Sequence, residues 1–373
     1  MYLGDYMETI KLSPRGYCHG VVNAINTITK LTEKSTKKTI TILGMVIHNK
    51  QIVNHFEHLG IKTLDSKNKT RLELLDEIDE GIVVFTAHGV SPEVKKKALD
   101  KGLEVIDTTC DDVIKSQEIV IDLLNNNYEI IYIGKHKHPE SEAAAGISEK
   151  VHIVENIDEV LSLNLNEKKV AVTNQTTMSL YDIYSLTEKI KQMYPNVHFV
   201  DEICNATRIR QEAIKNQDKS IEHCFIVGDK LSNNSRKLAE VSLQQAKIPS
   251  TLIENIEDIN INELMKYSKV SVSSGASTPT KVTNEVINFL QKFDKHDIST
   301  HNNSSQITIE NLITKKTLWN FRVFYFGILN YLHLWMFLKR ESFQLLQLQQ
   351  LHCHQYSQQL LRYNHYHLLN HIH

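Results

Sequence analysis

Short apolar runs alternate with amphipathic stretches over residues 7–292, and this alternation restricts the fold more than any other feature of the chain. The runs are rich in valine and isoleucine and do not alternate cleanly with polar residues, as is typical of strands buried on both faces of a parallel sheet. Six of them lie at residues 39–43, 82–86, 129–133, 169–173, 224–227 and 269–273. Helical patterns such as Pro92–Asp100 and 179–193 lie between them. The sequence therefore predicts an α/β protein with right-handed crossover connections.

Polar residues follow each of these runs, where the predicted strand ends. Ligands of open parallel sheets bind outside the carboxyl ends of the strands, so these residues are candidates for one binding site. They are His48, His88, His138, Thr176, Ser232, Asn233, Asn234 and Ser277. Such donors, helped by helix N-termini, suit a phosphate or diphosphate. A lone loop histidine is usually a packing or solvated residue, so the prediction depends on the whole set.

Three cysteines divide the chain into nearly equal parts. Cys18 and Cys110 are 92 residues apart, and Cys110 and Cys204 are 94 residues apart. Two polar strand ends follow each cysteine at similar distances, and periodic order of this kind indicates a repeated architecture. We therefore predict three αβ domains, related by a pseudo-threefold axis around a central site. Their expected ranges are residues 7–110, 111–200 and 201–293. Residues 294–373 are expected to form an unassigned, disordered or irregular tail.

Each of these cysteines directly precedes a helical pattern, and a helix N-terminus stabilises the thiolate, which is the form that binds metal. Three thiolates suit an iron–sulfur cluster with one iron left open for substrate. A single free cysteine is more often a small buried hydrophobe, and we assign that role to Cys224. Zinc is the rival metal, but structural zinc sites favour close pairs such as C-x-x-C, and the sequence contains none.

Glu140 follows His138 by two residues, in a turn that the repeat places near Thr176. A carboxyl group in a dry pocket beside a cluster can stay protonated and act as a general acid. The alternative is an ordinary helix-capping or surface glutamate.

These residues belong to motifs that, in order, resemble the 4-hydroxy-3-methylbut-2-enyl diphosphate reductase family of the non-mevalonate isoprenoid pathway. Each motif alone is weak, but the ordered set is highly specific. The motifs lie at residues 14–18, 46–49, 87–90, 107–110, 138–140, 174–177, 203–207, 210–213 and 275–277.

The resemblance implies a trefoil of three αβ domains around one [4Fe–4S] cluster per chain, with Cys18, Cys110 and Cys204 as ligands. It implies that Glu140 delivers protons and that Thr176 orients the substrate hydroxyl, with His138 also at the catalytic centre. The diphosphate would be held by His48, His88, His138, Thr176, Ser232, Asn233, Asn234 and Ser277. The implied reaction reduces 4-hydroxy-3-methylbut-2-enyl diphosphate to isopentenyl and dimethylallyl diphosphate, with single electrons from ferredoxin or flavodoxin.

Two residues depart from the family's usual pattern. Asp111 stands where proline is usual and adds negative charge near Cys110, and Asn233 stands where serine is common, so that one diphosphate donor would be an amide. Two other functions stay open: a non-catalytic diphosphate sensor on the same fold, and a zinc-dependent hydrolase that uses the same thiolates.

The net charge of −2 gives no global field that would attract nucleic acid or an anionic membrane. The first residues lack the pattern of a secretory signal, and five widely spaced cysteines indicate a reducing compartment, so we expect a cytoplasmic protein. Residues 318–338 are long enough to span a bilayer. They contain Asn320, Arg322, Asn330 and His333, however, and charged or polar residues there are costly. No stable membrane insertion is therefore expected.

Overall fold

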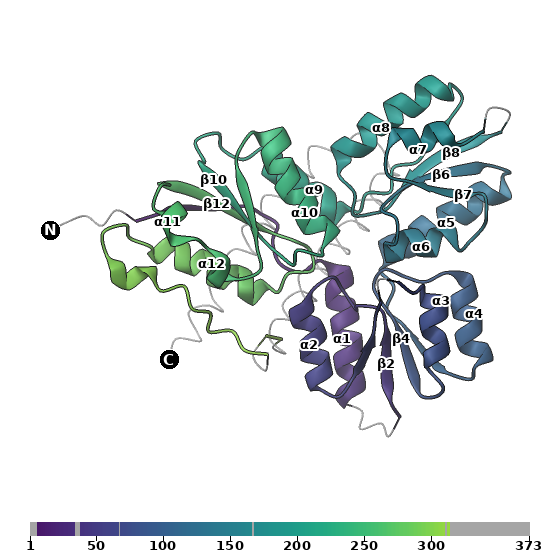
Figure 1. The fold of residues 1–373 in the computed structure, drawn as a ribbon, viewed down its shortest axis with the longest axis horizontal. Coiled ribbons are helices and arrows are strands. Elements are labelled where there is room, and N and C mark those ends of the chain that lie inside the picture. The colour runs from purple at the N-terminus through teal and green to yellow at the C-terminus, as the bar shows by residue number, and fades with distance from the viewer. Residues whose placement is uncertain (1–5, 34–37, 67, 166–167, 310–311, 314–373) are drawn as a thin grey trace, which may run out of the picture. The chain divides into compact units, whose positions relative to one another are not determined.

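The computed structural model describes residues 6–33, 38–66, 68–165, 168–309 and 312–313, and it confirms the predicted α/β class (Figure 1). Within these residues lie three parallel sheets of four strands each, with the orders β3-β2-β4-β5, β7-β6-β8-β9 and β11-β10-β12-β1. The strand order is the same in all three sheets, because the second strand along the chain always lies at the edge beside the first. This common order is the predicted threefold repeat.

The first sheet has a completely buried centre and partly exposed edges. Its strands are β2 (Ile40–Leu43), β3 (Lys62–Leu64), β4 (Ile82–Phe85) and β5 (Glu104–Asp107). Its helices are α1 (His19–Glu33), α2 (Lys50–His58), α3 (Arg71–Leu74) and α4 (Pro92–Asp100), with the 3₁₀ turn Leu75–Glu77. Side-chain caps start several of them, since Asn49, Thr70 and Ser91 each accept a backbone N–H of the following helix.

The second sheet carries an apolar core on each of its faces, one of them around Ile131 and Val172 and the other around Ile130 and Ala171. Its strands are β6 (Glu129–Ile133), β7 (Val151–Val154), β8 (Val170–Asn174) and β9 (His198–Phe199). Its helices are α5 (Asp111–Asn125), α6 (Pro139–Ala145), α7 (Ile157–Ser162) and α8 (Leu180–Met193). Burial on both faces explains why its central strands read as continuous apolar runs.

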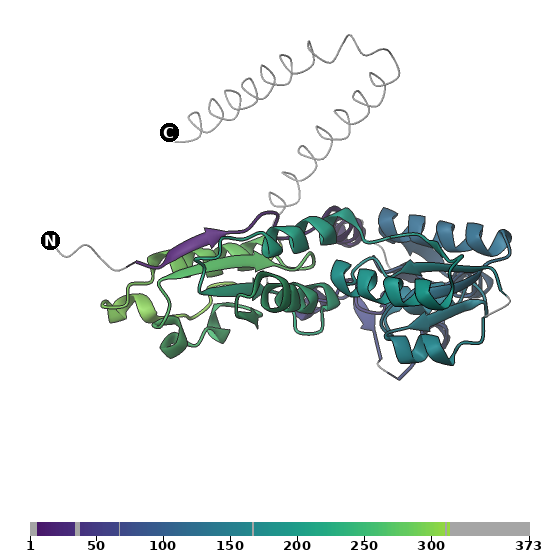
Figure 2. The same ribbon diagram turned by 90° about the horizontal axis from the view of Figure 1, so that it is seen from above.

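The third sheet takes its fourth strand from the other end of the chain. Its strands are β10 (His223–Val227), β11 (Ser250–Ile253), β12 (Lys269–Ser274) and β1 (Glu8–Lys11). Its helices are α9 (Asn205–Lys215), α10 (Asn233–Val241), α11 (Ile261–Leu264) and α12 (Thr280–Lys292), with short turns at Ser242–Ala246 and Ile256–Asp258. Figure 2 shows β1, in purple, beside the green strands of this sheet, and Thr9 pairs in parallel register with Val270. The range 7–110 expected for the first domain therefore contains one strand of the third sheet, while the domain boundaries themselves stay a prediction.

The described part of the expected tail contacts the domains before it. After the 3₁₀ turn Ile298–His301, Asn303 Nδ2 donates to the carbonyls of Ile256 and Ile259, each at 3.0 Å. The Ile309 carbonyl lies 2.9 Å from His55 Nδ1 on α2. In the residues described, no helix has both the length and the apolar character needed to cross a membrane. The segment 318–338 lies outside these residues.

Candidate active site

The same hydrogen bond positions each of the three cysteines. Each follows the fourth strand of one sheet and directly precedes the next helix, as N-cap of α5 for Cys110 and of α9 for Cys204. The backbone N–H of each cysteine donates to a carbonyl in the loop after a third strand: Cys18 to Ala276 at 3.0 Å, Cys110 to Ala87 at 3.0 Å and Cys204 to Thr176 at 3.1 Å. These three loops also carry Ser277, His88 and Thr176, so one repeated contact joins each thiol to a polar strand end.

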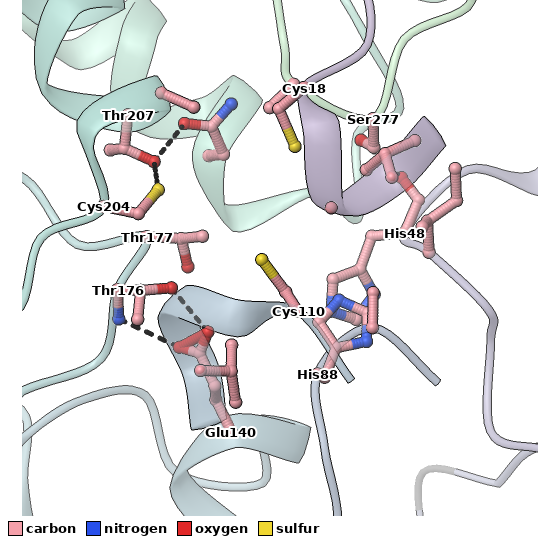
Figure 3. A pocket seen from close by; sticks show the side chains of 18 of the residues that line it. Cys18, His48, His88, Cys110, Glu140, Thr176, Thr177, Cys204, Thr207 and Ser277 are labelled. Atoms are coloured by element: carbon pink, nitrogen blue, oxygen red, sulfur yellow. Dashed lines mark hydrogen bonds between the residues drawn. The ribbon is translucent and has the colours of Figure 1, made fainter. Parts of the chain in front are cut away.

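One cavity is lined by every site residue selected from the sequence (Figure 3). These residues come from all three domains: Cys18, His48, His88, Cys110, His138, Glu140, Thr176, Cys204, Ser232, Asn233, Asn234 and Ser277. The predicted convergence of distant parts of the chain is therefore present in the structure. The roles of the individual residues stay predictions.

The surroundings of the three thiols suit the binding of a metal cation. Burial raises the pKa of each, to about 12 for Cys204. Backbone N–H groups of the following helical turn lower the pKa of each thiol, and the Arg210 guanidinium also lowers that of Cys18. A coordinated metal deprotonates its thiol ligands outright and supplies the charge that burial withholds. The donor set therefore fits a metal centre.

The spacing of the sulfur atoms favours a cluster over a single ion. Among the described residues, two groups of possible ligands have all their ligand atoms within 4.8 Å of one another: His48, His88 and His138, and His19, Cys110 and Asp112. The three cysteines do not form such a group. Three sulfur atoms on one tetrahedral zinc would lie ~3.8 Å apart, given Zn–S bonds of ~2.3 Å. A wider trio suits a cluster in which each sulfur binds a different iron.

The three histidines form a partly buried cluster that presents N–H groups. The Glu140 backbone N–H donates to His138 Nδ1 at 3.1 Å, so neutral His138 carries its proton on Nε2. This Nε2 donates to His48 Nε2 at 3.2 Å. Burial, with the Arg71 charge, lowers the pKa of His48 to about 4 and those of His88 and His138 well below 6.5. A metal ion on all three rings would need a lone pair that His138 Nε2 lacks, whereas an anion needs the N–H that it has.

Of the polar residues from the third domain, Asn234 offers the clearest free donor. Its side chain is 5% exposed, and its Nδ2 has no hydrogen-bond partner in the described part of the chain. An unpaired buried donor costs ~1–3 kcal/mol, which a bound anion would remove. Asn233 differs, because its Nδ2 donates to the Thr177 carbonyl at 3.0 Å. Its amide thus supports the loop after β8, while the residue also lines the cavity.

Glu140, on α6, and Thr176, in the loop after β8, are joined by two hydrogen bonds within the second domain (Figure 3). Thr176 donates its backbone N–H to one carboxylate oxygen at 2.9 Å and its hydroxyl to the other at 2.6 Å. Burial raises the pKa of Glu140 to about 7, although both hydrogen bonds from Thr176 lower it. A carboxyl with this pKa is close to half protonated at neutral pH, which suits proton transfer. The side chain contacts the loop after β8 and does not cap its own helix.

Residues 10–291 match the model of a family described as LytB protein. The chain belongs to the LytB protein family. It is 47% identical over 311 residues to the 4-hydroxy-3-methylbut-2-enyl diphosphate reductase of Geobacillus kaustophilus and 44% identical to that of Bacillus subtilis. Each alignment covers 83% of this chain and 98% of the relative.

Solved structures agree with this assignment to the LytB family. The E-1-hydroxy-2-methyl-but-2-enyl-4-diphosphate reductase of Plasmodium falciparum superimposes with a TM-score of 0.71 at 27% identity, over 85% of this chain and 98% of that one. A second structure, of (E)-4-hydroxy-3-methyl-but-2-enyl diphosphate reductase, superimposes with a TM-score of 0.55 at 28% identity. It is described as the terminal enzyme of the non-mevalonate pathway.

Three residues of this LytB chain contribute to the cavity or its charge without having been selected from the sequence. Asp112 and Thr207 line the cavity, and buried Arg210 donates to the Gly16 carbonyl at 2.7 Å. Both Thr207 and Arg210 lie within the motifs at residues 203–207 and 210–213, and Thr207 also stands three residues after Cys204, where a side chain of the first helical turn faces the N-cap. The contact of Arg210 had no signal in the spacing, because its partner lies 194 residues earlier in the chain.

Proposed function

We propose that the chain reduces 4-hydroxy-3-methylbut-2-enyl diphosphate to isopentenyl diphosphate and dimethylallyl diphosphate. The reaction breaks the carbon–oxygen bond of the terminal hydroxyl, consumes two electrons and two protons, and releases the oxygen as water. The observation that carries this proposal is the Glu140–Thr176 pair, which lies in the same cavity as the three thiols and the histidine cluster. Relatives of high identity carry the name of this reductase.

Cys18, Cys110 and Cys204 would hold a [4Fe–4S] cluster, one per chain. Their spacing, and the backbone N–H groups that lower the pKa of each thiol, support this assignment. When bound, such a cluster supplies single electrons and a Lewis-acidic iron. Because each electron enters singly, the physiological donor would be a one-electron carrier of the ferredoxin or flavodoxin class. A reducing, cytoplasmic location is consistent with four described cysteines that are all free thiols.

The diphosphate would lie against donors from all three domains. Asn234 Nδ2 is the side-chain donor whose geometry supports this role best, because it has no partner among the described residues. His138 has a fixed tautomer, and its Nε2–H, which donates to His48 Nε2, would turn to the anion. The remaining ligands would be His48, His88, Ser232 and Ser277, with Asn233 acting through the loop that it braces. Neutral histidines can donate to an anion without the cost of a buried charge.

Protons would reach the substrate through Glu140 and Thr176. When Glu140 is protonated, its O–H can donate to Thr176 Oγ1, and the Thr176 hydroxyl is then free to donate to the substrate hydroxyl. When Glu140 is ionised, Thr176 donates to it instead. The pair can therefore pass a proton to a departing hydroxyl while Thr176 keeps the substrate oriented.

Anaerobic purification followed by turnover with a reducing dye tests the proposal. We expect a brown, oxygen-sensitive protein with about four irons per chain, whose spectrum changes on addition of the diphosphate substrate and which releases both products. A colourless zinc protein would refute the cluster. A brown protein that binds substrate without turnover would refute the reductase and leave a diphosphate sensor.

A further inference from the structure

The residue three positions after each cysteine breaks the threefold repeat. Cys18 is followed by Val21, Cys110 by Val113, and Cys204 by Thr207. All three side chains line the cavity, so they occupy equivalent places at the first turn of α1, α5 and α9. Only Cys204 therefore has a hydroxyl at this position.

The Thr207 hydroxyl connects a cysteine sulfur to the proposed anion site through one side chain. Its Oγ1 lies 3.1 Å from Cys204 Sγ and 3.4 Å from Asn234 Oδ1 (Figure 3). Thr207 is completely buried, and Asn234 is nearly so. The opposite end of the same amide, Asn234 Nδ2, is buried and has no hydrogen-bond partner among the described residues. The path from sulfur to the free N–H thus crosses a single side chain.

A hydroxyl has one proton to donate. While Cys204 is a thiol, its S–H donates to Thr207 Oγ1, and the Thr207 hydroxyl donates to Asn234 Oδ1. A cysteine that binds metal is a thiolate and has no proton, so the hydrogen bond must then run from Thr207 to the sulfur. Cys204 and Asn234 Oδ1 compete for the same proton.

We propose that Thr207 is a positioning residue that couples the reduction potential of the cluster to diphosphate binding, through its shared hydrogen bond to Cys204 and Asn234. This inference rests on the proposed function. A hydrogen bond to a ligand sulfur stabilises the more electron-rich cluster and raises its potential. An anion on Asn234 Nδ2 polarises the amide and makes Oδ1 a stronger acceptor. Diphosphate binding then draws the Thr207 proton from Cys204 and lowers the potential.

The coupling is reciprocal by thermodynamic necessity. If diphosphate lowers the potential, it binds more tightly to the oxidised protein than to the reduced one by the same factor. Part of that factor is the direct repulsion between the anion and the added electron, which any residue at position 207 would leave in place. The part carried by Thr207 is the part that its replacement removes.

Redox titration of the anaerobic holoprotein, with and without saturating inorganic diphosphate, tests the coupling. Thr207→Val gives Cys204 the residue that its two counterparts already have, and Thr207→Ser keeps the hydroxyl. Without diphosphate we expect Thr207→Val to have a more negative reduction potential than the wild type. At the same applied potential, its ratio of reduced to oxidised cluster should be lower by about threefold or more. That ratio corresponds to ~28 mV, given ~59 mV per tenfold change for one electron. Thr207→Ser should stay near the wild type.

The decisive quantity is the shift that diphosphate causes. We expect it to be smaller in Thr207→Val than in the wild type. The matched control, Val113→Thr, adds a hydroxyl at the equivalent place beside Cys110 and should keep the wild-type shift. A Thr207→Val protein with the wild-type potential and the wild-type shift would overturn the proposal.

A second variant covers the case in which Thr207→Val does not take up the cluster. Asn234→Ala removes the competing acceptor and leaves the hydroxyl, so its shift with saturating diphosphate should also be reduced; an unchanged shift would overturn the coupling. Failure of the proposed function has a different signature. A wild-type protein without an iron–sulfur cluster would overturn that function and the coupling with it, whereas a clustered wild type that matches Thr207→Val would overturn the coupling alone.

Discussion

Replacing Glu140 by glutamine separates the acid chemistry of this position from its place in the fold. Glutamine has the same shape, can accept the Thr176 N–H that now lies 2.9 Å from the carboxylate, and can donate to the Thr176 hydroxyl at 2.6 Å. It cannot release a proton. We therefore expect turnover to fall ~10²–10⁴-fold, the usual contribution of general acid catalysis, while the cluster content stays that of the wild type.

The same change should remove a dependence of stability on pH. Burial raises the pKa of Glu140 from 4.5 to about 7, so the folded protein holds this proton more tightly than the unfolded chain. Its contribution to the free energy of unfolding is complete below pH 4.5 and is lost as the pH rises toward and beyond 7. Between pH 5.5 and 8 the loss amounts to ~2 kcal/mol, from ~1.36 kcal/mol per pKa unit. Glu140→Gln should not show it.

Urea unfolding followed by circular dichroism at pH 5.5 and 8, under anaerobic conditions, measures this difference. Comparing the two pH values within each protein cancels any constant effect of the amide. Exposed Glu149, just beyond α6, provides the matched control, and Glu149→Gln should keep both the activity and the pH dependence of the wild type. Equal pH dependence in Glu140→Gln and the wild type would refute a buried, protonated Glu140, and undiminished turnover would remove it from the reaction.

Three further changes test the cluster site. Cys110→Ser should abolish cluster-supported activity and lower the iron content per chain, and a fully active variant would contradict its role as a ligand. Gly20→Ala would place a methyl group 2.5 Å from Cys110 Sγ, so we expect loss of iron with secondary structure retained, measured by iron analysis and circular dichroism. Arg210→Met leaves the Gly16 carbonyl without its donor and removes a charge that lowers the pKa of Cys18. We expect unfolding in urea to be easier by ~1–3 kcal/mol and the cluster to be lost more readily, and unchanged stability would argue against this role.

The central strands were predictable from the sequence because burial on both faces requires them to consist mostly of apolar residues. β2 and β4 are buried on both faces, so their residues are almost all apolar, and the observed bounds differ from the predicted ones by one residue. The edge strands have no comparable apolar run. β5 has exposed ends, and β9 has only two residues, so packing against a neighbour defines them rather than any local pattern.

The residues of the candidate site also fall into those that a local pattern predicts and those that only the folded structure reveals. The cysteines and histidines could be selected because a strand end or helix start fixes where they lie, and that information is local. Asn233 lines the cavity with the other selected residues, but its hydrogen bond to the Thr177 carbonyl was not predictable, since it depends on how the second and third domains meet. Arg210 is similar, because only the folded chain brings it to Gly16. The spacing of residues within one domain does not predict its contacts with another domain.

The position of β1 explains why counting from the cysteines found the repeat. Each cysteine lies where the chain leaves the fourth strand of one sheet and enters the helix of the next, so the repeat unit in the sequence is shifted by one strand from the sheet in space. Among the described residues after β12, no strand completes the third sheet, and β1 takes that place beside β12. This pairing closes the ring of three domains and brings Cys18 to the place that Cys110 and Cys204 reach by simple continuation. The position of Cys18 therefore depends on the pairing of β1 with β12, so the proposed cluster site can form only when all three domains have folded.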